Sequence, residues 1–342
     1  MIKWLLVIVK LAISLAILVY VVDKALRDNP TIFSELAQQS KNWNALAAAW
    51  CLCFAAVTTT IVRWYLLVRA LELPFRVRDA FRLGFFGFLC NLVSLGSVGG
   101  DLFKAIFIAR EQPGRRTEAV STVVVDRVVG FYGLLLLTSV VILSINLEGI
   151  DREIKVVCNV ALLGTAVGTV LVGLFLRPGF TTGPASEFLS QLPRIGSMLE
   201  RLIGALRMYR RKLPVLGIAC AMSVGTHSLF AVGVYMIANG LLAEVPLLSE
   251  HFLIVPLGTV VGAVPLPLGA LGAYEGGMEI LYEHVPLAKL AAGDGLLVAL
   301  GYRIVTVAIA MVGVCFYLAN RREMTALLRE ADGHPSDEPP AC

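Results

Sequence analysis

The side chains of this sequence that could do chemistry are a small number of charged groups placed within long apolar segments. The acids Asp101 and Glu275 each end a glycine-rich stretch, and arginines follow them at similar distances, at Arg127 and Arg303. A charged side chain that faces lipid costs several kcal/mol, so each of these groups is expected to face a partner or a water-filled cavity. The pattern indicates a charged cavity that could hold the polar headgroup of a lipid.

Two interpretations of these charges are open. In the first, Arg127 and Arg303 bind phosphate or balance the acids, while Asp101 and Glu275 contact a cationic or hydroxylated headgroup or exchange protons with it. In the second, the charges form buried ion pairs that lock helices together. We favour the first for these four residues; for Arg63, near the end of its segment, snorkelling is as good an explanation. A secondary set of candidate site residues lies in the same segments, Arg63, Lys104 and Asp126, and Glu279 is a further ionisable residue there.

The glycines and prolines that precede the two acids have a physical use at a binding site. Glycine lets backbone approach a ligand closely, and the N–H groups at a helix start attract anions such as phosphate. The simpler alternative is that Asp101 and Glu275 cap the helices that begin there, a role that suits Asp101 better than Glu275. Beside the acids and arginines, the candidate headgroup-binding residues are Asn91, Gly99, Gly100, Pro265, Pro267 and Gly272.

Signatures of enzymes are absent from the sequence. It contains no Walker loop, no nucleotide-binding glycine fingerprint, no zinc-binding pair of histidines and no convincing Ser-His-Asp set. His227 and His251 are isolated, and the seven cysteines lie mostly in apolar segments, as small packing residues do. We therefore expect no enzymatic activity, no metal or other cofactor and no nucleic-acid partner.

The composition places the chain in a membrane. Of its 342 residues, 57% are hydrophobic and only 16% are charged, whereas soluble domains contain about 25% charged residues. A helix needs about 20 apolar residues to cross the hydrocarbon core of a bilayer. Six segments are long enough to cross: about Trp4–Val22, Asn44–Val68, Ala119–Ile145, Ile154–Leu176, Pro214–Leu242 and Leu290–Asn320.

Two further apolar segments, Ala80–Leu95 and Phe252–Leu271, are interrupted by glycine, asparagine or proline. Glycine and proline at such density end helices, and broken backbone at membrane depth is tolerated only where protein or a water-filled cavity covers it. We therefore predict two re-entrant helical hairpins, each broken at its tip. Two ordinary kinked spans are the alternative.

The distribution of lysine and arginine predicts the orientation. Seven of these residues lie between Arg177 and Lys212, and others follow the second span, the first hairpin and the last span, whereas the opposite loops carry few. Both termini are therefore predicted to be cytoplasmic. Residues 186–213 have apolar side chains at helical spacing and arginines on the other face, which predicts an amphipathic helix on the cytoplasmic leaflet. Packing of this helix on the protein's own loops is the alternative.

Each half of the chain then contains two spans, a hairpin and a third span. With three crossings per half, the second half must be inverted relative to the first, a plan that recurs in transporters. The predicted domains are a first membrane repeat over 1–148, a second over 149–322 and a disordered polar tail over 323–342. The repeat would place Asp101 on Glu275 and Arg127 on Arg303.

Three motifs carry a resemblance to a known family. They are Asn91-Leu-Val-Ser-Leu-Gly-Ser-Val-Gly-Gly-Asp101, Asp126-Arg127-Val-Val-Gly130 and Pro265-Leu-Pro-Leu-Gly-Ala-Leu-Gly-Ala-Tyr-Glu275. In order and spacing the chain resembles the lysylphosphatidylglycerol synthase transmembrane family, the flippase-like region of the bacterial multiple-peptide-resistance proteins, from about Trp4 to Asn320. One departure is Leu95-Gly96-Ser97, where the family often has proline and glycine.

The resemblance implies movement of lipids between leaflets, in the best-known members an aminoacylated phosphatidylglycerol. The soluble synthase module of the full-length proteins is not expected in this chain. Family members that occur alone are connected with varied lipids, including isoprenoid-linked sugars and hopanoids, so the substrate does not transfer with the fold.

We therefore predict an all-α polytopic protein of the bacterial cytoplasmic membrane that translocates a polar or glycosylated lipid. Membrane lipids are the expected partners, and homo-oligomerisation is left open. One alternative is a non-transporting accessory protein that scaffolds a lipid-modifying enzyme through its basic cytoplasmic loop, and another is a membrane-embedded glycosyl or acyl transferase. Transport predicts acids that water and lipid can reach, whereas a scaffold predicts buried, paired acids and a required cytoplasmic surface.

Overall fold

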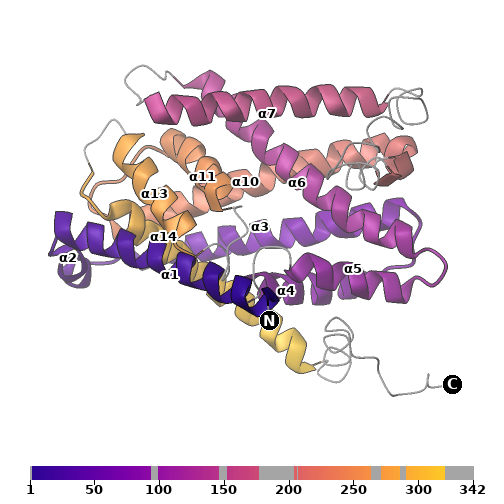
Figure 1. Ribbon diagram of the computed structural model, residues 1–342, viewed down its shortest axis with the longest axis horizontal. Coiled ribbons are helices and arrows are strands. Elements are labelled where there is room, and N and C mark those ends of the chain that lie inside the picture. Colours follow the sequence, from indigo (N-terminus) through magenta and orange to yellow (C-terminus); the bar gives the residue numbers. More distant parts are fainter. Residues whose placement is uncertain are drawn as a thin grey trace.

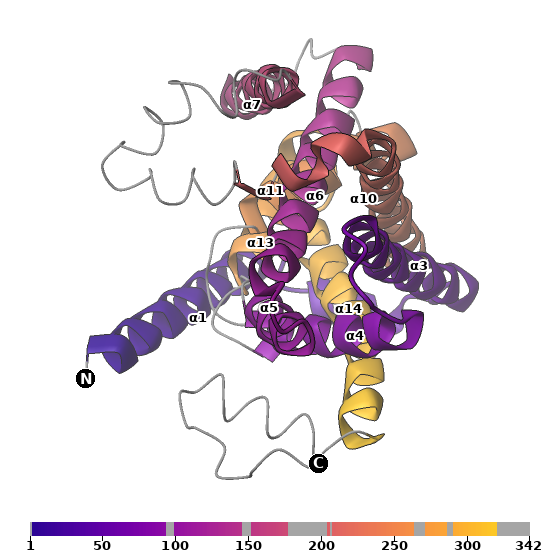
Figure 2. The same cartoon turned by 90° about the vertical axis from the view of Figure 1, so that its right-hand side faces the viewer.

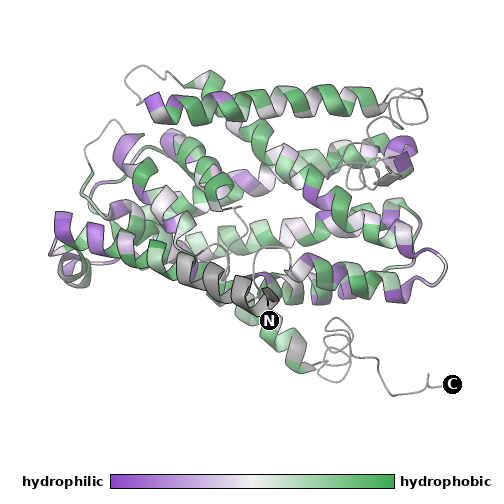
Figure 3. Ribbon diagram, in the orientation of Figure 1, coloured by the Kyte–Doolittle hydropathy of each residue, from purple (hydrophilic) through white to green (hydrophobic). Residues whose placement is uncertain are grey.

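The computed structural model describes residues 2–93, 99–145, 152–176, 204–205, 207–262, 271–285 and 290–319. These residues form helices joined by short turns, and no strand occurs among them (Figure 1). Figure 3 shows hydrophilic residues gathered towards the left and right ends of the molecule, with hydrophobic residues over most of the length between them. This distribution is that of a helical protein whose middle lies in lipid.

Within the described residues, five helices are long and apolar enough to cross a bilayer. They coincide with five of the six segments that the sequence predicts to span. Helix α1 (Ile2–Asp28) covers the remaining segment, and its crossing stays a prediction. The five helices are α3 (Trp43–Ala70), α6 (Arg116–Ser144), α7 (Arg152–Leu176), α10 (Leu213–Leu241) and α14 (Asp294–Ala319).

Helices α3 and α10 form the most extensive helix pair of the molecule. They approach closely because small residues line the contact: a Cβ at Gly233 would lie 2.7 Å from Cys53 Sγ, and one at Gly240 would lie 2.6 Å from Leu46 Cγ. Small residues at helix contacts are the usual means of tight association in membranes. Asn42 begins α3, where its side-chain oxygen accepts a hydrogen bond from Ala45 N at 3.2 Å.

Two helical hairpins pack beside this central pair. The first consists of α4 (Val77–Val93) and α5 (Gly99–Glu111), and the second of α11 (Leu248–Gly262) and α13 (Ala273–His284). Helices α5 and α13 have 13 and 12 residues, which is short of the about 20 residues that a full crossing needs. Figure 1 shows the two hairpins towards opposite ends of the molecule.

The helix contacts of the two halves are reciprocal. Helix α14 packs on α4 of the first hairpin, and α6 packs on α11 of the second. In each half the hairpin also packs against the span before it and the span after it, α3 and α6 in the first half and α10 and α14 in the second. The halves are therefore interlocked, because each hairpin contacts a span from the other half.

Three elements lie outside this core. Helix α7 packs mainly on α6 and lies at the edge of the molecule, whereas α1 rests on α13 and α14 and extends away from the bundle (Figure 2). The short helix α2 (Ile32–Gln38) follows α1. The contact between α6 and α7 includes polar residues, because the Ser139 and Thr165 hydroxyls lie 2.6 Å apart.

Most of the predicted amphipathic segment 186–213, and the predicted tail 323–342, lie outside the described residues. The described end of that segment packs on protein, because the Tyr209 hydroxyl is buried and donates to the Leu67 carbonyl oxygen at the end of α3, at 2.8 Å. Beside it, Lys212 Nζ donates to the Glu72 carboxylate at 2.8 Å, which lowers the pKa of Glu72 below its ordinary value. At this end of the segment, packing on the protein's own loops is therefore the interpretation that the contacts favour.

Candidate functional site

The first predicted charge pair joins α5 to α6. Asp101 lies in the first turn of α5, and its carboxylate accepts from Arg127 Nη2 at 2.6 Å and also contacts Arg127 Nε. The guanidinium thus holds both carboxylate oxygens, a geometry that lysine could not reproduce. The Arg127 side chain is 50% exposed, compared with 16% for Asp101. The arginine is therefore the more accessible member of this pair.

The second pair joins α13 to α14, and it is more deeply buried than the first. Arg303 donates to Glu275 Oε1 through Nε at 3.0 Å and Nη2 at 2.7 Å. Glu275 Oε2 accepts from Gly272 N at 2.7 Å, and Gly272 has a φ of +87° that favours glycine. The Glu275 side chain is fully buried and that of Arg303 is 20% exposed. Both oxygens of the Glu275 carboxylate are thus hydrogen-bonded to protein groups.

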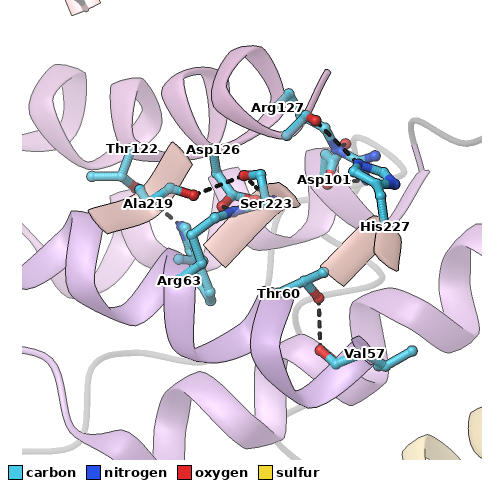
Figure 4. A network of polar contacts seen from close by, with 12 residues as sticks. Val57, Thr60, Arg63, Asp101, Thr122, Asp126, Arg127, Ala219, Ser223 and His227 are labelled. Atoms are coloured by element: carbon cyan, nitrogen blue, oxygen red, sulfur yellow. Dashed lines mark hydrogen bonds and ion pairs between the residues drawn. The ribbon is translucent and has the colours of Figure 1, made fainter. Parts of the chain in front are cut away.

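A third pair lies at the junction of α3, α6 and α10 (Figure 4). Arg63 donates from Nε to Asp126 Oδ1 at 2.8 Å and from Nη1 to the Ser223 hydroxyl at 2.7 Å. The Arg63 and Asp126 side chains are only 6% and 11% exposed. The snorkelling interpretation of Arg63 is wrong, because its guanidinium points into the bundle and is bound there.

Consecutive residues of α6 thus serve two different pairs. Asp126 faces the buried junction, and Arg127 faces Asp101 on α5 (Figure 4). His227 on α10 lies one turn further along, with Nε2 3.2 Å from the Gly130 carbonyl oxygen. Because a carbonyl oxygen only accepts, this contact requires a proton on Nε2.

Lys104 adds a further cation beside the first pair. Its side chain lies over the Trp64 ring, 5.2 Å from the centroid, near the acids Asp126 and Asp101 that attract its charge and the cations Arg127 and Arg63 that repel it. By formal charge, three cations (Arg63, Lys104, Arg127) and two acids (Asp101, Asp126) lie in the described part of this cluster, a formal excess of one positive charge. The corresponding pair of the second half, Glu275 with Arg303, is neutral. The first cluster is therefore the one suited to an anion.

The remaining predicted residues differ in what they do. Asn91 Oδ1 accepts from Gly100 N at 2.8 Å, so this amide joins α4 to α5 and occupies one of the helix-start N–H groups. Gly100 has no room for a side chain, because an added Cβ would overlap the Gly87 carbonyl oxygen. Gly99 begins α5. Pro265 and Pro267 lie outside the described residues.

Glu275 has a capping role, although it is the poorer capping residue by type. Its carboxylate accepts from the backbone N–H of Gly272, which precedes α13. Helix geometry explains this outcome, because a glutamate at the third position of a helix is long enough to reach back to the residue before it. Glu279 also has a capping role, since its two oxygens accept from Gly293 N at 2.7 Å and Leu296 N at 2.8 Å at the start of α14.

Sequence reasoning missed several partners of these charges. Ser223 and Trp64 are ordinary residues of apolar segments, and no pattern in the sequence marks them as neighbours of Arg63 or Lys104. His251 is isolated in the sequence, but in the structure it is fully buried and its Nε2 lies 2.7 Å from the Tyr282 hydroxyl. The contact joins α11 to α13 and holds the second hairpin together.

The fold and these charges define a multi-pass helical membrane protein with ion pairs inside its bundle. Comparison with known sequences places it more narrowly. The family described as lysylphosphatidylglycerol synthase TM region matches residues 7–313, and the chain belongs to this family. It is also similar to a UPF0104 membrane protein of the archaeon Methanothermobacter thermautotrophicus (strain Delta H), with 24% identity over 253 residues that cover 68% of this chain and 72% of the relative.

Proposed function

We propose that this protein translocates a polar lipid between leaflets, with an anionic or glycosylated headgroup bound at the Asp101–Arg127 cluster. The observation that carries the proposal is the half-exposed Arg127, held by one carboxylate beside Lys104 in a cluster with one excess positive charge. A lipid phosphate can replace the carboxylate on the guanidinium, because both offer two oxygens at matching spacing. We further propose that the chain has no enzymatic activity of its own.

An inverted repeat would give such a headgroup a path through the membrane. The reciprocal contacts α4–α14 and α11–α6, the equivalent acid–arginine pairs and the shortness of α5 and α13 support two re-entrant hairpins that enter from opposite faces. Broken helices that meet near mid-depth are a recurring way to build a polar site in a transporter. We also propose cytoplasmic termini and a location in the cytoplasmic membrane of a bacterium.

The proposed orientation predicts a labelling pattern. In a variant that lacks the seven native cysteines, single cysteines at Asn29 and Glu244 should react with a membrane-impermeant maleimide added to intact cells. Cysteines at Arg115 and Arg210 should react only after permeabilisation, because the basic loops remain on the cytoplasmic side. Labelling of the Arg210 position in intact cells would show that the orientation is opposite to the one proposed.

A scaffold function is the second candidate, and the burial of the acids favours it. Glu275 is fully buried and saturated by protein partners, and Asp126 is 11% exposed and paired. Paired acids of this kind are what a protein with locked helices would show. Of the three ion pairs described above inside the bundle, the Asp101–Arg127 pair is the one with a half-exposed member, so the choice between transport and scaffold depends on this cluster.

Reconstitution of the purified full-length protein tests the proposal. Vesicles would contain fluorescent phosphatidylinositol, which is anionic, or phosphatidylcholine, which is zwitterionic, and a membrane-impermeant quencher would report the lipid in the outer leaflet. We expect the protein to accelerate exchange of the anionic lipid over protein-free vesicles, and to act less on the zwitterionic one. Exchange no faster than in protein-free vesicles for anionic and glycosylated lipids alike would reject transport and leave the scaffold function.

A further inference from the structure

Tyr274 is a buried polar residue beside the second charge pair, and its hydroxyl is unsatisfied. Its side chain lies on α13 immediately before Glu275, and the residue is 7% exposed. Among the described residues its hydroxyl has no hydrogen-bond partner. Buried polar atoms almost always have partners in folded proteins, so an unsatisfied one calls for an explanation.

The ring of Tyr274 is held in place by α11. A Cβ at Gly262 would lie 3.1 Å from Tyr274 Cδ2, and one at Gly258 would lie 3.7 Å from Tyr274 Cε2. The ring thus packs against two glycines one helical turn apart, and a larger residue at Gly262 would push it away. Its hydroxyl cannot turn far to find another partner.

On the side of α14, the neighbour of Tyr274 is aromatic. The Tyr302 ring on α14 lies 5.4 Å from it with a 38° tilt, and Phe230 on α10 contacts Tyr302 edge-on at 6.2 Å. Tyr302 directly precedes Arg303, at the position that Asp126 occupies before Arg127 in the first half. The second half therefore has a phenol where the first half has a carboxylate.

The charges next to Tyr274 do not satisfy its hydroxyl. Both Glu275 oxygens are engaged, Oε1 by Arg303 and Oε2 by Gly272 N. Since this pair is neutral, the second half offers a ligand a hydroxyl and aromatic faces but no excess charge. The first half offers an excess positive charge. A headgroup that fits both halves carries a phosphate and an uncharged part with hydroxyl groups.

We propose that the Tyr274 hydroxyl, beside the ring of Tyr302, hydrogen-bonds a hydroxyl of the lipid headgroup and makes the protein selective for hydroxylated anionic lipids. The inference rests on the proposed translocation of a polar lipid. A site that is built to hydrogen-bond a hydroxyl discriminates against an analogue that lacks it, because the protein group is then left unpaired. The unsatisfied Tyr274 hydroxyl is such a group.

The exposure of the two charge pairs indicates when this contact forms. Arg127 is 50% exposed, whereas Arg303 is 20% exposed and Glu275 is fully buried. In this conformation Arg127 of the first pair is accessible, whereas Glu275 of the second pair and the neighbouring Tyr274 are buried. A headgroup that enters at Arg127 reaches Tyr274 only after the second half opens, so Tyr274 acts at a later step than Arg127.

The substitution Tyr274→Phe tests the proposal with two lipids of equal charge. Phosphatidylinositol has a hydroxylated ring on its phosphodiester, whereas phosphatidylmethanol has the same phosphodiester without hydroxyls. We expect the wild-type protein in vesicles to translocate phosphatidylinositol about 3- to 10-fold faster, the range of one hydrogen bond. Tyr274→Phe should bring this ratio close to unity by slowing phosphatidylinositol alone, and its melting temperature should be unchanged or higher.

Tyr282→Phe is the matched control, since Tyr282 lies on the same helix with its hydroxyl bound to His251. This variant should melt at a lower temperature, because it leaves a buried imidazole nitrogen unpaired, and it should keep the lipid ratio of the wild type. A wild-type ratio in the Tyr274→Phe variant would overturn the inference and leave the transport function intact. If the wild-type protein moves neither lipid, the transport function fails, and the inference fails with it.

Discussion

Replacement of Arg127 with alanine is expected to reduce translocation of an anionic lipid by about 10- to 100-fold, the range of a charged hydrogen bond, while the protein stays folded. The guanidinium is the half-exposed cation of the first cluster, so a phosphate would bind there first. Its loss also removes the excess positive charge, since Arg63 and Lys104 then face Asp101 and Asp126 in equal number. Initial translocation rates in vesicles of equal protein content are the measurement.

Arg127→Lys separates charge from geometry. Lysine retains the positive charge but cannot hold two oxygens of a carboxylate or phosphate at once, so we expect an intermediate rate. Thermal unfolding in detergent should show a small change for both variants, because partly exposed ion pairs contribute about 0–1 kcal/mol. Wild-type rates in Arg127→Ala would show that the charge has no transport function. Loss of folding would assign it to structure.

Arg303→Ala should behave differently from Arg127→Ala, although each arginine follows its acid at a similar spacing in the sequence. Its removal leaves the fully buried Glu275 carboxylate with the Gly272 N–H as its one hydrogen-bond partner among the described residues. An orphaned buried charge destabilises strongly, so this variant should lose stability as well as transport. A comparison of the two variants thus measures the difference between the accessible and the buried pair.

Much of the fold follows from patterns that the sequence displays directly. Spans such as α3 and α14 are continuous apolar runs of crossing length, and glycine or proline interrupts the two segments that form hairpins. The acid and arginine of each pair lie at similar spacing in the two halves. This spacing relates Asp101 and Arg127 to Glu275 and Arg303 in the sequence, and in the structure each acid binds its arginine.

The partners of the charges could not be predicted to the same depth. Whether Arg63 points to the interface or into the bundle depends on the rotation of α3 about its own axis, and its apolar segment does not fix that rotation. Its direction is set by contacts with Asp126 on α6 and Ser223 on α10, which lie 63 and 160 residues away in the chain. The unsatisfied hydroxyl of Tyr274 is likewise a property of packing between four helices, and no local pattern reports it.

Removal of one partner of the buried Arg63–Asp126 pair should have the largest effect on stability of any single change considered. Arg63→Ala leaves Asp126 as a buried carboxylate without its hydrogen-bonded cation, and Asp126→Ala leaves the guanidinium with the Ser223 hydroxyl as its hydrogen-bond partner among the described residues. Breaking a buried pair in this way costs about 3–5 kcal/mol. We therefore expect either variant to melt many degrees below the wild type in detergent, with low yield.

The double variant Arg63→Met, Asp126→Leu tests whether the Arg63–Asp126 pair has a structural role or a role in transport. Replacing a buried ion pair with apolar residues of similar volume is often neutral or stabilising, so the double variant should regain most of the lost stability. It removes one positive and one negative charge, and the excess positive charge beside Asp101 and Arg127 is unchanged. We therefore expect it to translocate anionic lipid at close to the wild-type rate. A stable double variant that moves no lipid would show instead that the Arg63–Asp126 junction belongs to the transport site, and that the headgroup contacts it on the way across.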